Sequence, residues 1–172
     1  MNEELGPLLI APVSYLELRN RLRAALGFPN EWKALLIGID GTNGSGKSAL
    51  AAWLSWQLEM PAVHLDLYLV PNRDPPAWRT EDLARVIEVQ KALERPMLIE
   101  GILLLNVLDS INRKPDVLVF VDKHEHQSSE DYLAAYLNQR TPKEVADYVL
   151  EWSSAEHDRR VMEAHLAVSR RG

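Results

Sequence analysis

Eight consecutive residues in the first third of the chain have the types and the spacing needed to hold a phosphate chain. Gly41 and four further residues precede Gly46-Lys47-Ser48, which is the P-loop pattern. The glycines let backbone N–H groups converge on an anion, the lysine reaches the β- and γ-phosphates, and the hydroxyl ligates Mg²⁺. We therefore predict that ATP and Mg²⁺ bind at Gly41, Thr42, Asn43, Gly44, Ser45, Gly46, Lys47, Ser48 and Ala49.

The segments on either side of this loop supply the strand and the helix that the motif requires. Residues 34–40 are almost continuously apolar, which is typical of a strand buried on both faces. Leu50, Leu54 and Leu58 then recur at helical spacing, so a helix is expected to begin where the loop ends. We assign Trp53 and Trp56 to the core side of this helix, because an apolar helical stripe usually faces the core.

Strands and helices alternate along the rest of the core. Apolar runs at 62–66, 97–100 and 117–122 predict three more strands, and helices are expected over 80–94 and within 102–111. Such alternation is typical of a parallel sheet joined by right-handed crossovers. We therefore predict an α/β fold, a three-layer α/β/α P-loop NTPase core with a mostly parallel sheet and helices on both faces.

Each of the four predicted strands ends in a carboxylate, namely Asp40, Asp66, Glu100 or Asp122. Ligands of open parallel sheets bind outside the carboxyl ends of the strands, so we expect these side chains on the rim that holds the phosphates. Asp66 is our candidate general base for a hydroxyl acceptor, and Glu100 is a candidate catalytic and metal-binding residue. Asp40 is expected to bond local backbone, and Asp122 receives no catalytic role. His64 is interpreted as a core histidine.

Basic and aromatic side chains supply the remaining candidates. Phosphoryl transfer needs cationic help beyond the P-loop lysine, and Arg140 and Lys143 stand where a helical lid could close. The loop at 67–79 follows Asp66 and can shape an acceptor pocket. Its candidate substrate-binding residues, in addition to Asp66, are Tyr68, Arg73, Trp78 and Arg79. Surface charge and a tryptophan packed under a proline-rich loop explain each of these residues about equally well.

Both ends of the chain are expected to be helical. Ser14 and Glu17 form a capping box for a first helix that stops at Gly27. After the fourth strand, one helix is expected from Ser128 or Ser129 to about residue 139. Another is expected from Thr141 to about residue 169, with no fifth strand.

These segments are interpreted as a single domain over residues 1–172. It comprises an N-terminal helix and connector at 1–33, a core at 34–122, and a helical lid and C-terminal region at 123–172.

The composition is that of an ordinary globular domain. Of the 172 residues, 47% are hydrophobic and 26% are charged, and the formal net charge is −6. An acidic chain lacks the basic footprint of nucleic-acid binding, no apolar run approaches the length of a membrane span, and the absence of cysteine excludes disulfides. We therefore expect a cytoplasmic protein that binds neither nucleic acid nor membrane. Nothing in the sequence indicates its oligomeric state.

Four segments together resemble the uridine kinase and phosphoribulokinase group of P-loop kinases, to which bacterial pantothenate kinase is related. They are GTNGSGKS at 41–48, HLDLY at 64–68, LIEGILLL at 98–105 and DVLVFVD at 116–122, and the resemblance extends over about residues 34–150. It implies transfer of the γ-phosphate of ATP to a hydroxyl of a small molecule, most often the 5′-hydroxyl of a nucleoside. It also implies that Asp66 activates the acceptor, that Ser48, Asp66 and Glu100 surround Mg²⁺, and that Tyr68 lines the acceptor pocket.

The chain departs from the pattern of this group in three places. Group members usually carry an arginine-rich lid helix directly after the fourth strand, where this chain has Arg140 as its one arginine between 122 and 140. They usually continue into a fifth strand, and a small or acidic residue is common where Leu67 stands.

Three functions fit these residues. The first is a uridine kinase-like enzyme, and the second is a P-loop kinase for a sugar, a vitamin precursor or an antibiotic. The third is a nucleotide-binding regulatory protein with weak or no transfer. The loop at 67–79 is where the first two would differ.

Overall fold

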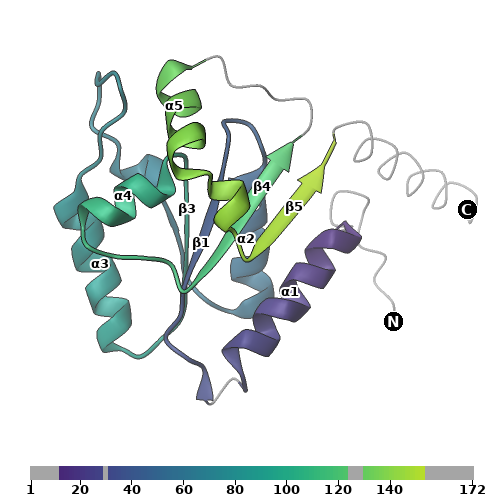
Figure 1. Cartoon of the computed structure of the whole chain (residues 1–172). Helices are drawn as coiled ribbons and strands as arrows, with labels where there is room; N and C mark the ends of the chain where they lie inside the picture. The colour runs from purple at the N-terminus through teal and green to yellow at the C-terminus, as the bar shows by residue number, and fades with distance from the viewer. Residues whose placement is uncertain (1–11, 29–30, 124–129, 154–172) are drawn as a thin grey trace, which may run out of the picture.

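The computed structural model describes residues 12–28, 31–123 and 130–153, and its centre is a five-stranded sheet in the order β2-β3-β1-β4-β5 (Figure 1). All neighbouring strands pair in parallel. The strands are β1 (Leu36–Gly41), β2 (Ala62–His64), β3 (Met97–Glu100), β4 (Val117–Lys123) and β5 (Tyr148–Trp152). The predicted α/β fold is confirmed, and the strand expected at 97–100 has the predicted bounds.

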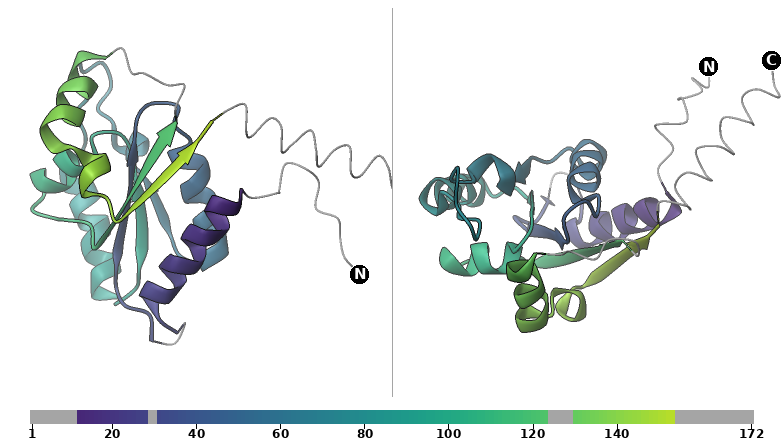
Figure 2. Two further views of the ribbon diagram at one scale, coloured as in Figure 1. Left: turned by 45° about the vertical axis from the view of Figure 1, so that its right-hand side comes forward. Right: turned by 90° about the horizontal axis from the view of Figure 1, so that it is seen from above.

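Helices cover both faces of this sheet (Figure 2). One core cluster lies under α1 and α2, another under α3 and α4, and a smaller one at α5. α1 and α2 pack on one face, while α3, α4, α5 and the one-turn α6 lie over the other. The helices in the described residues are α1 (Val13–Leu26), α2 (Lys47–Leu58), α3 (Thr80–Ala92), α4 (Leu104–Ser110), α5 (Asp131–Arg140) and α6 (Pro142–Val145), and a 3-10 turn, η3 (Leu65–Tyr68), follows β2.

The central strand β1 contributes to both cores. Ile37 and Ile39 belong to the core under α1 and α2, whereas Leu36 belongs to the core under α3 and α4. Successive strand side chains point to opposite faces, so all six residues of β1 are buried. This burial explains the continuous apolar run from which the strand was predicted.

The two tryptophans of α2 have different environments. Trp53 packs against the core and lies with its ring centroid 5.4 Å from that of Tyr15 on α1. Trp56 is 70% exposed, so its assignment to the core is wrong. Leu50, Leu54 and Leu58 define the buried stripe of α2, and Trp56 lies two residues from that stripe, about 200° around the helix.

The start of α1 differs from the prediction and its end agrees with it. The helix begins at Val13 after Pro12, and no side chain caps it. Ser14 therefore lies inside the first turn rather than at the N-cap, and the predicted capping box with Glu17 is wrong. Gly27 ends the helix with a φ of 91°, a conformation that glycine adopts without strain.

The region after α5 contains a strand that the sequence did not reveal. α6 begins at Pro142 as predicted but ends after four residues, and β5 follows at Tyr148 and pairs with β4. Asp147 is bonded to β4 through two groups: its carboxylate accepts the N–H of Leu118 at 2.7 Å, and its own N–H donates to the Leu118 carbonyl at 2.9 Å. These bonds hold the chain beside β4 and prevent the helix from continuing. The expected helix from Thr141 to about residue 169 is therefore wrong over 146–152.

Ser128, Ser129 and the segment 154–169 lie outside the described residues, and α5 is described from Asp131 onward.

We predict that α1 is a structural part of the core and not a loosely attached cover. Leu22 is fully buried between α1 and α2, so Leu22→Ala should lower the free energy of unfolding by about 2–5 kcal/mol. Urea denaturation measures this change. Leu16→Ala on the same helix, where the side chain is 37% exposed, is the control and should cost clearly less; equal effects would contradict the packing.

Candidate active site

The P-loop joins the end of β1 to the start of α2, and its glycines allow a tight path. Gly44 and Gly46 have φ values of 67° and 93°, in the left-handed region that other residues disfavour. At Gly41 a Cβ would lie 2.4 Å from the carbonyl oxygen of Val121 on β4. The loop thus takes the predicted strand–loop–helix form, in which backbone N–H groups and a helix N-terminus attract anions.

Lys47 lies under this loop and is surrounded by acidic side chains. It is 7% exposed, and its Nζ donates to the Thr42 carbonyl oxygen at 2.7 Å. Burial lowers the pKa of Lys47, while the nearby carboxylates of Glu100, Asp40 and Asp66 act in the opposite direction. The ammonium group is therefore held at the rim by its own loop and by the charges of these three carboxylates.

Glu100 is the polar centre of the rim. It is 2% exposed, and its Oε1 accepts a hydrogen bond from the Ser48 hydroxyl at 2.9 Å and lies 2.7 Å from Nδ1 of His64. A carboxylate oxygen only accepts, so Nδ1 of His64 carries the proton in this contact. The interpretation of His64 as a core residue is wrong: its side chain is 32% exposed and lies beside Glu100.

The donors at this point suit Mg²⁺. Among the residues that the structure describes, no three His, Cys, Asp or Glu side chains gather as a metal cluster. Mg²⁺ in phosphoryl-transfer sites, however, usually takes one or two carboxylates together with phosphate oxygens and water. Ser48 and Glu100 bring hydroxyl and carboxylate oxygens within 2.9 Å of each other, so two of the three predicted ligands converge.

The third predicted ligand, Asp66, lies on η3, the turn that follows β2 and its Glu100 partner His64. Its side chain is exposed, and its charge acts on Lys47. The turn is positioned by Leu65, which is fully buried against Gly101. A Cβ at Gly101 would meet the Leu65 side chain at 2.6–2.8 Å. The absence of a side chain after Glu100 is therefore what lets the Asp66 turn pack beside β3.

The predicted acceptor loop is ordered around two of its candidates. The Arg79 guanidinium lies 6.0 Å from the Tyr68 ring centroid and donates to the Leu67 carbonyl at 2.6 Å. Trp78 pairs with the strand-like residue Leu69 and packs between the α3–α4 core and the residues around α5. Arg73 is exposed. Tyr68 and Arg79 are thus brought together, whereas Trp78 joins the loop to α5.

Asp40 makes a longer-range contact than predicted. Its Oδ1 accepts the Gly41 N–H at 2.7 Å, and its Oδ2 accepts a hydrogen bond from the hydroxyl of Tyr136 on α5. The carboxyl group is fully buried, and this burial raises its pKa to about 6, against the hydrogen bonds and the charge of Lys47. The expected bond to local backbone is present, but it is not the only one, because α5 covers this end of β1 and supplies Tyr136.

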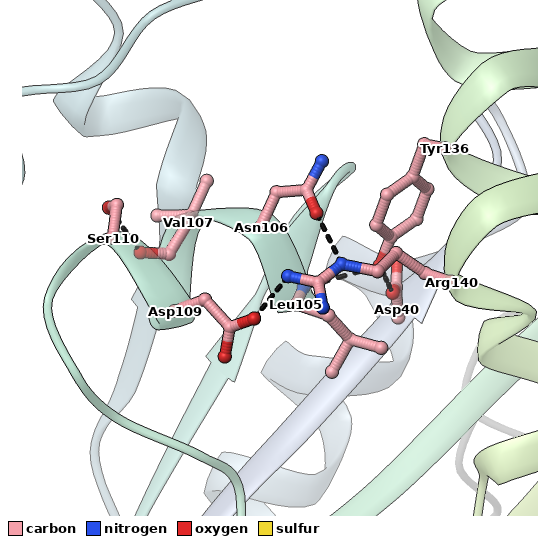
Figure 3. Close-up of polar contacts among 8 residues, drawn as sticks. All are labelled: Asp40, Leu105, Asn106, Val107, Asp109, Ser110, Tyr136 and Arg140. Atoms are coloured by element: carbon pink, nitrogen blue, oxygen red, sulfur yellow. Dashed lines mark hydrogen bonds and ion pairs between the residues drawn. The ribbon is translucent and has the colours of Figure 1, made fainter.

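Arg140 faces α4 in this structure. Its Nε donates to the Asn106 side chain at 2.6 Å, and its guanidinium is ion-paired with Asp109 (Figure 3). The guanidinium that was expected to assist phosphate transfer is therefore bonded to two side chains of α4.

Lys143 joins the ends of two strands. Its Nζ lies 2.6 Å from Asp122 on β4 and 2.9 Å from Glu151 on β5. The hydrogen bonds to these carboxylates raise the pKa of Lys143 to about 12. Asp122, which was given no catalytic role, is thus part of an ion-pair cluster with the lysine of α6.

A further contact at the P-loop involves residues that were not predicted as partners. The side-chain amide of Asn43 donates to Glu130, at the start of α5, at 2.6 Å. Glu130 and Tyr136 both belong to the region after β4, and no sequence spacing ties them to the loop. Their contacts become visible only once α5 is seen lying over β1.

Comparison with known proteins agrees with this architecture. A possible uridine kinase from Bacillus stearothermophilus matches with a TM-score of 0.54 at 20% identity, over 80% of this chain and 97% of that chain. A putative fructose transport system kinase from Silicibacter sp. TM1040 gives 0.44 at 19% identity over 91% and 89%. Shikimate kinase from Bacteroides thetaiotaomicron gives 0.40 at 16% over 78% and 98%. No protein-family model and no curated protein matches the sequence.

The chain has the three-layer α/β/α fold of the P-loop NTPases, with an all-parallel sheet. At the level of the fold, its resemblance to the uridine kinase group is confirmed by the possible uridine kinase structure. None of the helices in the described parts of the chain is long and apolar enough to cross a membrane.

The close approach at Gly101 predicts a specific effect of adding one methyl group. Gly101→Ala should force Leu65 away from β3 and lower the free energy of unfolding by about 1–3 kcal/mol, because the site has no room for a Cβ. Denaturant unfolding measures the loss. Because Leu65 and Asp66 are neighbours on η3, the variant should also move Asp66 and change any activity in which Asp66 takes part. Stability equal to that of the wild type would contradict the contact.

The raised pKa of Asp40 predicts a pH dependence of stability. Between about pH 4 and pH 6 the folded protein retains a proton that the unfolded chain has released, so this group makes the free energy of unfolding fall as pH rises. Asp40→Asn should remove this fall, on the order of 2–3 kcal/mol across that interval. The measurement is denaturant unfolding at several pH values. Asp131→Asn, at the exposed start of α5, is the control; parallel wild-type and Asp40→Asn curves would refute the prediction.

Proposed function

We propose that this protein is an ATP-dependent small-molecule kinase that transfers the γ-phosphate to a hydroxyl group. The observation that carries the proposal is the convergence of Lys47, Ser48 and Glu100 at the P-loop, with Asp66 on the adjacent turn. Phosphoryl transfer requires a phosphate clamp, a divalent metal and a residue that orients or deprotonates the acceptor. Lys47 belongs to the clamp, Ser48 and Glu100 to the metal site, and Asp66 to the acceptor.

Each residue then has a defined role. The P-loop N–H groups and Lys47 hold the β- and γ-phosphates, for which Lys47 exchanges its bond to Thr42 for the phosphate oxygens. Ser48 and Glu100 would hold Mg²⁺, with Asp66 on the turn after β2, and such a metal would supply positive charge to the phosphates. Asp66, which is exposed, accepts the proton of the acceptor hydroxyl.

A nucleoside is the proposed acceptor, and the loop at 67–79 is its proposed site. Tyr68 offers an aromatic face and Arg79 a guanidinium beside it, a combination that can stack on a base and bond a sugar or carbonyl oxygen. The fold shared with a possible uridine kinase supports this choice. A sugar, a vitamin precursor or an antibiotic is the alternative acceptor. The net charge of −6 supports a small-molecule substrate rather than nucleic acid, and we propose a cytoplasmic location.

One observation favours the second candidate, a nucleotide-binding regulatory protein with weak or no transfer. Arg140 and Lys143, the cations expected to assist transfer, are engaged by Asp109 and by Asp122 and Glu151, respectively. A kinase of this kind must release one of them, or use a cation from elsewhere, when the transition state forms.

Replacement of Asp66 distinguishes the two candidates. Asp66→Asn should lower phosphate transfer by about 10²- to 10⁴-fold, because the general base is lost, while Mg-ATP binding changes little. ADP release with a panel of nucleosides, pantothenate-like compounds and sugars measures transfer, and calorimetry measures binding. Asp131→Asn on the exposed start of α5 is the matched control.

Either of two results would contradict the kinase proposal. One is the absence of turnover with every acceptor despite tight ATP binding, which would favour the regulatory function. The other is an Asp66→Asn variant that transfers phosphate as fast as the wild type.

A further inference from the structure

Tyr136 on α5 contacts the end of the central strand from a position 96 residues away in the sequence. Its side chain is 2% exposed, and its hydroxyl donates to Oδ2 of Asp40 while accepting the backbone N–H of Leu105 at 3.2 Å (Figure 3). One phenol oxygen thus joins α5, the first turn of α4 and the residue that immediately precedes the P-loop.

The two carboxylate oxygens of Asp40 accept hydrogen bonds from different parts of the chain. Oδ1 accepts the N–H of Gly41, the first P-loop residue, at 2.7 Å, and Oδ2 accepts the phenol. With both oxygens bonded, the carboxylate plane has one orientation. Asp40 is fully buried, so no solvent can replace a lost partner. The phenol therefore controls the orientation of the group that holds the start of the P-loop.

The hydroxyl is not required to attach α5 to the protein. Leu133 is fully buried in the same helix and packs with Leu103, and Arg140 joins the end of α5 to Asp109 of α4. A phenylalanine at 136 would keep the ring and its packing. The hydroxyl adds a bond to a buried charge, and bonds of this kind are among the stronger ones in proteins.

Two further observations link the same contacts to phosphate binding. The charge of Asp40 acts on Lys47, the residue whose amine the proposed function assigns to the phosphates. At its other end, α5 meets the P-loop again, where Glu130 accepts the Asn43 amide at 2.6 Å. α5 thus contacts the loop at its base and at its tip.

We propose that Tyr136 is a positioning residue for the P-loop: by holding Asp40, it fixes the Gly41 N–H and keeps the buried carboxylate from turning toward Lys47. The inference rests on the proposed function only in taking Mg-ATP as the ligand of the loop. Without the hydroxyl, Asp40 keeps only its backbone hydrogen bonds with Gly41 and Leu104. The positive charge of Lys47, the lysine that must reach the phosphates, then attracts a carboxylate that is held less firmly. Nucleotide affinity should fall, whereas acceptor binding should not.

The test is Mg-ATP binding to the full chain by calorimetry. Tyr136→Phe should weaken the affinity about tenfold, the effect of losing a hydrogen bond to a charged group. Tyr15→Phe removes the same atom from a tyrosine of α1 on the opposite face, and Asp109→Asn cuts the other attachment of α5. Both controls should bind Mg-ATP as the wild type does.

A double-variant cycle separates positioning from simple support of the fold. If Tyr136 acts through Asp40, Tyr136→Phe should have little further effect on Mg-ATP affinity in an Asp40→Asn background. Independent, additive losses would overturn the inference, as would a Tyr136→Phe variant that binds Mg-ATP like the wild type while melting at a lower temperature. With an acceptor that turns over, KM for ATP should rise and KM for the acceptor should stay constant.

The same measurements on the wild type test the proposed function separately. A wild type that binds Mg-ATP but transfers phosphate to no acceptor removes the kinase proposal and leaves the Tyr136 comparison decisive. A wild type that binds no Mg-ATP overturns both.

Discussion

The parallel register of β2, β3 and β1 is the constraint on which the site depends. Backbone hydrogen bonding pairs His64 with Glu100, and Glu100 in turn with Ile39, one residue before Asp40. Because parallel strands end on one side of the sheet, side chains that are far apart in the sequence reach the same level. A shift of one strand by a single residue would turn Glu100 to the other face and remove it from Ser48.

The sequence was most informative at positions where one structural requirement determines the residue type. The P-loop was predicted from its glycines. β3 with its terminal Glu100 was predicted with the observed bounds, since a buried parallel strand has a continuous apolar run. Gly101 follows the same logic, although its reason, the approach of Leu65, is visible only in the structure. Local pattern was thus sufficient where the constraint itself is local.

The prediction failed where a contact between distant segments decides the outcome. β5 follows a strong helix-start signal at Thr141 and Pro142, and Asp147, bonded to Leu118, redirects the chain into a strand. His64 has the setting of a core residue until its pairing with Glu100 is known. Nothing in the sequence indicates that Tyr136 contacts Asp40, because Asp40 lies on the distant strand β1. Periodicity assigns Tyr136 only to the buried side of a helix.

The contact between Leu65 and Gly101 has a consequence for how such chains can diverge. A methyl group at position 101 would meet the Cβ, Cγ and Cδ1 atoms of Leu65 at 2.6–2.8 Å, so the two positions form one steric unit although they lie far apart in the sequence. The nearest of these atoms is Cβ, which every residue except glycine carries, so a shorter side chain at 65 would not make room for a larger residue at 101. A larger residue at 101 therefore requires the turn with Asp66 to take another backbone path, and homologous chains should be compared there by the course of this turn rather than position by position.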